Sequence, residues 1–284
     1  MYFPVGWPKQ LNAAQPTGDL RPLVHICSNQ DRLLFAVLTH SSISVWYCKP
    51  AVQIVCFRRS DNSVVEFGMN VSAKWKPDSS MIAITTSKGY ILFYQVEVEL
   101  QKKNACLYVQ REERQIGGKR DEIELNASDS IPALNLSQVA YKQVLGGVTS
   151  LVCLREELMV ATHSGTLQRI RWDGLVNEDM TIHLGSIPFS NDLQHSRALQ
   201  LNDPSIYVCR QDYSPLLGGF AVVLSNGRAA FITANTLKFE PSNVVGVWAQ
   251  EVTRATTAAI NHKYTLMAFG CQNGEGIVYH LDEL

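Results

Sequence analysis

The sequence has no pair of cysteines at the spacing of a metal site or a redox motif. Its seven cysteines are widely separated, and none forms a C-x-x-C motif. An odd, dispersed set of thiols is poor evidence for a disulfide framework or a zinc site. We therefore expect reduced, mostly buried thiols and no metal, as in a cytoplasmic protein. The cysteines are Cys27, Cys48, Cys56, Cys106, Cys153, Cys209 and Cys271.

Two further absences concern charge and long apolar runs. The formal net charge of −1 provides no overall field that would attract nucleic acid, so we expect no nucleic-acid partner. No uncharged apolar run approaches the length of a membrane span. The first residues, MYFPVGWPKQLN, lack the basic start and apolar segment of a signal peptide. We expect neither secretion nor membrane insertion.

Catalytic motifs are also missing from the sequence. It contains no G-x-S-x-G, H-E-x-x-H, P-loop or G-x-G-x-x-G pattern, which are the minimal parts of hydrolase, zinc-protease and nucleotide-binding sites. The histidines are scattered, and carboxylate pairs such as Glu112-Glu113 lie in a charged segment without fixed geometry. We expect no catalytic or cofactor-binding residue and no cofactor, so the chain is predicted not to be an enzyme.

What the sequence does contain is a repeated hairpin. Residues 75–96 read WKPDSSMIAITTSKGYILFYQV: a Pro-Asp-Ser-Ser turn, an apolar run, a polar loop that ends in glycine, and a second apolar run. These signals predict two antiparallel strands. The same pattern recurs four times, in residues 33–47, 157–172, 219–233 and 265–281. The hairpin is therefore one of five.

Alignment of the five copies on the loop predicts two kinds of structural position. The loop glycines are Gly89, Gly165, Gly227 and Gly274, with Ser42 in the first copy. Six residues upstream lie Ala36, Ala83, Met159, Ala221 and Ala268. Because these side chains are mostly small, we expect them on inner strands that pack tightly near a crowded central axis.

The period of the repeat favours a β-propeller. Successive loop positions are 47, 76, 62 and 47 residues apart, against roughly 40–45 for one four-stranded blade. The short intervals fit one blade, and the long ones fit a blade with an insertion. The only W-D dipeptide is Trp172-Asp173, so the WD motif is degenerate. We predict an all-β, WD40-like β-propeller with about five recognisable blades, and we expect it to be incomplete.

The composition locates the two insertions. Residues 97–132 are dense in both charge signs, with Leu107 to Val109 as a strand-like centre, and predict an exposed loop or a long outer hairpin. This insertion is either a solvated loop or a docking element for a partner. A second insertion is predicted near 188–215, where a short helix could form. We expect residues 1–284 to form one propeller with no separate second domain.

Several segments resemble the N-terminal region of the ribosome control protein 1 family. The similarity covers almost the whole chain in the same order and is weakest in the charged insertion. The matching segments are MYFPVGWPKQL, AKWKPDSSMIAITTSKGYILFY, PALNL, IPFSNDLQHSR, GFAVV with FIT, and KYTLMAFG.

The resemblance implies a function. Members of this family are the larger subunit of a two-subunit guanine-nucleotide exchange complex, and they act with an arrestin-like smaller subunit on a Golgi Rab GTPase in retrograde endosome-to-Golgi transport. It implies a scaffold propeller in the cytoplasm, associated peripherally with the Golgi membrane through the complex. No family motif places exchange activity on particular residues of this chain. The alternative is a generic WD40 adaptor in a coat or ubiquitin-ligase assembly, because the fold alone permits both.

Overall fold

The computed structural model describes residues 22–48, 52–99, 113–116, 119–122, 133–154, 156–189, 205–234, 239–261, 263 and 265–280. Within these residues the chain forms four four-stranded antiparallel sheets, one three-stranded sheet and one separate two-stranded hairpin. The prediction of an all-β propeller with five recognisable hairpins is confirmed. The fifth sheet differs from the expected four strands, since it has three among the described residues.

The five sheets follow one another along the chain. The first contains β1 (Leu23–Ser28), β2 (Leu34–Thr39), β3 (Ser42–Tyr47) and β4 (Val52–Arg58), and the second contains β5 (Asn70–Trp75), β6 (Met81–Thr86), β7 (Tyr90–Glu99) and β10 (Ala133–Gln143). The third contains β11 (Ser150–Leu154), β12 (Glu157–Ala161), β13 (Thr166–Arg171) and β14 (Val176–His183). The fourth contains β15 (Val208–Ser214), β16 (Gly219–Leu224), β17 (Ala229–Ala234) and β18 (Val244–Trp248), and the fifth contains β19 (Ala255–Asn261), β20 (Leu266–Cys271) and β21 (Gly276–His280).

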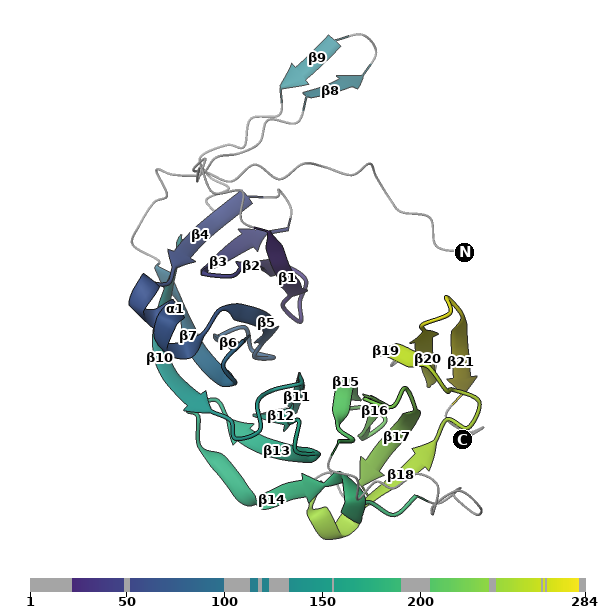
Figure 1. The fold of residues 1–284 in the computed structure, drawn as a ribbon. Helices are drawn as coiled ribbons and strands as arrows, with labels where there is room; N and C mark the ends of the chain where they lie inside the picture. The colour runs from purple at the N-terminus through teal and green to yellow at the C-terminus, as the bar shows by residue number, and fades with distance from the viewer. Residues whose placement is uncertain are drawn as a thin grey trace.

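The sheets are arranged as an open arc around a common axis (Figure 1). The first strand of each sheet faces this axis: β1 lies beside β5, β5 beside β11, β11 beside β15, and β15 beside β19. The first and fifth sheets stand on opposite sides of the opening, so the described part of the propeller is incomplete, as predicted.

The core lies between successive sheets, because the middle strands are buried on both faces. In β6, Ile82 and Ile84 pack toward the first sheet, whereas Ala83 between them packs toward the third. In β7, Tyr94 and Phe93 alternate in the same way. Strand side chains point alternately to opposite faces, so a strand covered on both sides reads as a continuous apolar run. This is why the sequence signal was strongest in the second and third strands of each sheet.

The charged insertion joins the third and fourth strands of the second sheet. Residues 97–99 belong to β7, so the insertion is shorter at its start than the predicted 97–132. It carries a hairpin of β8 (Glu113–Ile116) and β9 (Lys119–Glu122). In this hairpin Glu113 is paired with Glu122 at one end, and Ile116 with Lys119 at the other. Figure 1 draws this hairpin away from the arc. The predicted strand-like centre, Leu107 to Val109, lies outside the described residues.

The connection between the third and fourth sheets overlaps the second predicted insertion. Residues 208–214 form β15, the axial strand of the fourth sheet, so the end of the predicted range 188–215 belongs to this sheet. The connection from β14 to β15 begins with the 3-10 turn η1 (Leu184–Ser186), and Phe189 then stacks on Trp248 with ring centroids 4.0 Å apart. The helix considered for this insertion would fall largely in residues outside the described part of the chain.

A short helix that the sequence analysis missed links the first two sheets. Helix α1 (Asp61–Phe67) is capped by Ser60, whose side chain accepts a hydrogen bond from the backbone N–H of Ser63. Gly68 ends the helix with φ +88°. Another short turn, η2 (Pro241–Asn243), precedes β18. No helix in the described part of the chain is long and apolar enough to cross a membrane.

Candidate functional site

The four predicted loop glycines occupy equivalent turns between the second and third strands. Each has a positive φ, which side chains strongly disfavour, and each donates its backbone N–H to the carbonyl three residues earlier. Their φ values are +76° at Gly89, +72° at Gly165, +81° at Gly227 and +85° at Gly274. These positions shape the hairpins, and nothing in their geometry suggests ligand binding.

The predicted small residues lie on the second strand of each sheet, one strand away from the axis. The expectation that they line a crowded centre is therefore wrong, because the first strands face the axis. Ala36, Ala83 and Ala221 are fully buried between neighbouring sheets, as is Met159. Ala268 is exposed because, among the described residues, a neighbouring sheet covers only the opposite face of its strand, where Met267 and Phe269 are buried. Small side chains at this position allow close sheet packing.

The larger of two candidate sites is an open cavity of about 480 Å³ at the axis, which we call the axial cavity. Three axial strands, β1, β5 and β11, and the turns that follow β1 and β5 supply its walls. The lining residues are His25, Ile26, Cys27, Ser28, Gln30, Lys74, Trp75, Lys76, Pro77 and Cys153. Sequence analysis found none of them as site residues, since they lie far apart along the chain.

Hydrogen bonds between sheets fix the walls of this cavity. The backbone N–H of Ala73 in β5 donates to Nδ1 of His25 in β1 at 3.2 Å. The indole Nε1 of Trp75 donates to the carbonyl of Cys27 at 3.1 Å, and the thiol of Cys153 in β11 donates to the carbonyl of Trp75 at 3.1 Å. The three strands are thus joined across the sheet boundaries, and the cavity has a preformed shape.

Both thiols in the cavity are unreactive in this setting. Burial raises the pKa of Cys27 to about 12 and that of Cys153 to about 12, although the nearby Lys74 ammonium opposes the rise. A thiol must lose its proton to act as a nucleophile or metal ligand. At neutral pH these thiols remain protonated. No group of three or more potential metal-ligating side chains comes together among the described residues.

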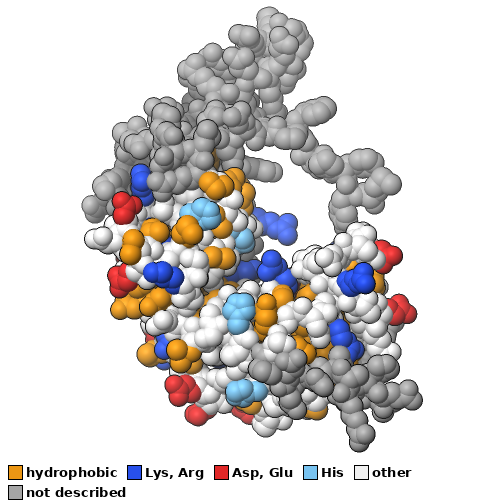
Figure 2. All heavy atoms as spheres, viewed as in Figure 1, with side chains coloured by type: hydrophobic (Ala, Val, Ile, Leu, Met, Phe, Trp, Pro, Cys, Tyr) orange, Lys and Arg blue, Asp and Glu red, His pale blue; other side chains and the backbone are white. Residues whose placement is uncertain are grey.

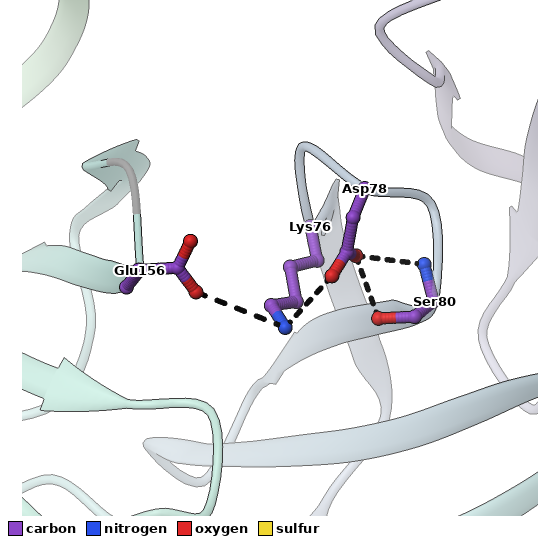
Figure 3. Close-up of polar contacts among 4 residues, drawn as sticks. All are labelled: Lys76, Asp78, Ser80 and Glu156. Atoms are coloured by element: carbon purple, nitrogen blue, oxygen red, sulfur yellow. Dashed lines mark hydrogen bonds and ion pairs between the residues drawn. The ribbon is translucent and has the colours of Figure 1, made fainter.

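One cation at the rim of the cavity is neutralised locally. Lys76 Nζ lies 2.9 Å from Asp78 Oδ2 and 4.0 Å from Glu156 Oε2, which comes from the neighbouring β11–β12 turn (Figure 3). Ser80 donates to Asp78 Oδ1 from its hydroxyl at 2.6 Å and from its backbone N–H at 2.9 Å. Burial alone would raise the pKa of Asp78, but the hydrogen bonds from Ser80 and Lys76 outweigh it and lower that pKa.

Two other cations near the axis have no such partner. Lys74 on β5 and Arg210 on β15 form no ion pair among the described residues, and the Arg210 guanidinium donates only to the neighbouring carbonyl of Cys209. Figure 2 shows some Lys and Arg side chains at the central hollow and others toward the outer edge, where the visible Asp and Glu side chains also lie. Lys74 and Arg210 therefore add positive charge near the axis of a chain that is nearly neutral as a whole.

A second, smaller cavity of about 330 Å³ lies between the third and fourth sheets. Glu157 and Arg169 on neighbouring strands β12 and β13 form an ion pair in its wall, and Arg171 pairs with Asp173 at 2.9 Å. Tyr213 and Phe239 close its other side. Because its charged groups pair with each other, this cavity offers an incoming ligand less uncompensated charge than the axial cavity.

Comparisons with known proteins identify relatives along nearly the whole chain. The guanine nucleotide exchange factor subunit RIC1 of Mus musculus is 38% identical over 283 residues, which are 99% of this chain and 20% of that protein. The guanine nucleotide exchange factor subunit R06F6.8 of Caenorhabditis elegans is 34% identical over 260 residues, 91% of this chain and 18% of that protein. The chain thus spans about one fifth of the length of these relatives. No family model matches it.

Solved structures show the fold alone. The β-propeller domain of Myceliophteria thermophila Cps50 (Swd1) superposes with a TM-score of 0.57 at 10% identity, covering 94% of this chain and 68% of that domain. Hsv2 of Kluyveromyces marxianus superposes with a TM-score of 0.51 at 13% identity, covering 93% of this chain and 60% of that protein. Both similarities agree with a propeller of which this chain forms a part.

Proposed function

Because this chain belongs to the family of the guanine nucleotide exchange factor subunits named RIC1, we propose that it is the scaffold propeller of such a subunit. The complex would activate a Golgi Rab GTPase in retrograde endosome-to-Golgi transport. The observation that supports this proposal is the 38% identity to RIC1 over 99% of the chain. The partners we propose are the Rab GTPase and an arrestin-like smaller subunit, through which the protein would associate peripherally with the Golgi membrane from the cytoplasm.

Within that complex we assign this region a positioning role and no direct part in nucleotide release. An exchange factor must stabilise the nucleotide-free GTPase through contacts that compete with those to phosphate and magnesium. Such contacts need an extensive, rigid surface that reaches the nucleotide. The axial cavity is small, so it is better suited to holding a short segment of a partner than to opening a GTPase.

Release of a fluorescent guanine nucleotide from the Rab tests this assignment. We expect the 284-residue chain alone to leave the release rate at its intrinsic value, whereas the complete two-subunit complex, as the positive control, should accelerate it. An acceleration of several-fold by the chain alone would place the exchange surface on these residues and would contradict the scaffold role.

Co-purification of the full-length protein distinguishes this function from a generic adaptor. Propellers serve many assemblies, and the fold does not choose among them. Recovery of an arrestin-like subunit together with a Rab supports the exchange complex. Recovery of coat components or a cullin without those partners would favour the adaptor and would contradict our proposal.

A further inference from the structure

Positive charge from sheets that are distant in the sequence lies at and beside the axial cavity. Lys74 lies on the axial strand of the second sheet and Arg210 on that of the fourth, and both act electrostatically on His25 of the first sheet. Lys74 lines the cavity, and Arg210 lies outside that lining on β15, the axial strand beside β11, which contributes Cys153 to the cavity. Only the curvature of the arc produces this grouping, since the residues are far apart along the chain.

Three carboxylates near this cluster already have partners. Asp78 and Glu156 pair with Lys76. Asp212, two residues after Arg210 on β15, accepts the backbone N–H of Tyr213 with one oxygen at 3.1 Å and that of Ile260 with the other at 2.9 Å. Within the described residues, Lys74 and Arg210 thus form no ion pair, and each can pair with an external anion.

The same cavity also exposes apolar surface and strand edges. Ile26 is 57% exposed and is among the residues that line the cavity, together with Pro77 and the buried Trp75. The axial strands β1, β5, β11 and β15 each pair with one strand only, so each has an edge toward the axis. Unpaired strand edges can hydrogen-bond an extended peptide, while neighbouring pockets receive its side chains.

We propose that the axial cavity binds an acidic, extended peptide segment of a partner protein. Its carboxylates would pair with Lys74 and Arg210, and an apolar side chain between them would pack on Ile26. A peptide fits better than a compact phosphate group because the two cations come from separate sheets and the exposed aliphatic residue, Ile26, comes from a third. This inference does not depend on the exchange-factor role, since any partner with such a segment would be recognised.

Peptide binding by the unaltered 284-residue chain tests the chemistry first. The probes are two fluorescein-labelled peptides of about twelve residues that share one sequence with two leucines. One carries Asp and Glu, and the other carries Asn and Gln in their place. Fluorescence anisotropy should give at least about tenfold tighter binding of the acidic peptide at low salt, weakening as salt screens the charges. Equal affinity for the two peptides would overturn the proposal.

Charge-reversal variants then test the location. The double substitution K74E/R210E should weaken binding of the acidic peptide by about tenfold or more. The matched control is K142E/R254E, which makes the same change in net charge at a half-buried residue of β10 and an exposed residue of the β18–β19 connection; it should stay within about twofold. Equal losses in both variants would show that only net charge matters and would overturn the proposal. Circular dichroism verifies folding, and R210Q alone serves if the double variant unfolds.

Two further probes separate peptide recognition from phosphate recognition. Ile26→Asp should weaken binding of the acidic peptide, since it removes the apolar contact and adds a like charge. Inositol hexakisphosphate and vesicles that contain phosphoinositides should bind no more tightly to the unaltered chain than to K74E/R210E. If either binds through Lys74 and Arg210 while the acidic peptide does not, the site recognises phosphate and the peptide proposal is wrong.

Discussion

The imidazole of His25 accepts a hydrogen bond from the backbone N–H of Ala73 at 3.2 Å, and this bond joins the axial strands of the first two sheets. An acceptor nitrogen must be unprotonated. Burial, followed by the positive charges of Lys74 and Arg210, lowers the pKa of His25 from its ordinary value of 6.5. The neighbouring thiols of Cys27 and Cys153 stay neutral, so the two cations are the charged groups that act on the ring.

We expect this histidine to make the protein less stable in mild acid. Above the unfolded pKa of 6.5 the contribution of His25 to stability is complete. As the pH falls below that value the unfolded chain takes up the proton first, and stability is lost until the lower folded pKa is reached. Urea unfolding midpoints measured from pH 8 to pH 5 should fall across this range.

His25→Asn is the matched control for that experiment. An asparagine side-chain oxygen can accept the Ala73 bond but does not titrate, so the fall in midpoint should be smaller in this variant. His25→Phe, which cannot accept the bond, should be less stable already at pH 8. An unchanged pH dependence in His25→Asn would contradict the role of this histidine.

Arg59 is expected to be essential for joining the first two sheets. Its side chain is 2% exposed, and its guanidinium donates to Gly68 O, Asn70 Oδ1 and Ser63 O, each at 2.8 Å. Replacement by methionine would leave these buried acceptors without a donor, which costs about 2–3 kcal/mol or more. The free energy of unfolding in urea measures the loss.

A double-mutant cycle with Asn70→Ala checks that account. If the two side chains act through their shared hydrogen bond, the combined loss should be smaller than the sum of the single losses. Strictly additive losses would contradict direct coupling between Arg59 and Asn70.

Large side chains should destabilise the protein at one of two equivalent positions and have little effect at the other. Ala83 is fully buried against the third sheet, whereas Ala268 is exposed on the outer face of the fifth. Ala83→Trp should destabilise by at least about 1–3 kcal/mol because overpacking displaces the neighbouring sheet. Ala268→Trp should change the urea midpoint little. Ala83→Val serves where the tryptophan variant does not fold, and equal midpoints for the two positions would contradict this packing.

The difference between these alanines also shows what sequence reasoning can reach. The second and third strands were predictable because double-sided burial gives continuous apolar runs around a turn glycine. The axial strands were not, since residues such as Lys74 and Arg210 in β5 and β15 interrupt the apolar pattern. No local pattern in the sequence shows that these two residues face one axis, because only the arc of sheets brings them together. The axial cavity therefore could not be predicted from the sequence.

Helix α1 was missed for a different reason. Its seven residues are too few to show a helical period, and the apolar positions within it are few. The local signals were Ser60 followed by Asp61 at the start and Gly68 at the end, which are typical of a capped helix. The buried Arg59 beside it gave no signal, since an arginine in sequence is expected to be exposed.

The loop glycines should differ in how much a side chain costs, although all four have a positive φ. A Cβ added to Gly89 would lie 3.0 Å from Cα of Gly147, a backbone atom, whereas one added to Gly274 would have nothing within 4 Å. Gly274→Ala should therefore cost only the conformational strain of about 1–2 kcal/mol. Gly89→Ala should cost more, and Gly89→Val more again, because the turn also contacts the neighbouring sheet. Urea midpoints rank the three variants, and co-purification of partner subunits should decline in the same order. Equal midpoints for Gly89→Ala and Gly274→Ala would show that the Gly147 turn yields without cost, in contradiction to close packing between these two sheets.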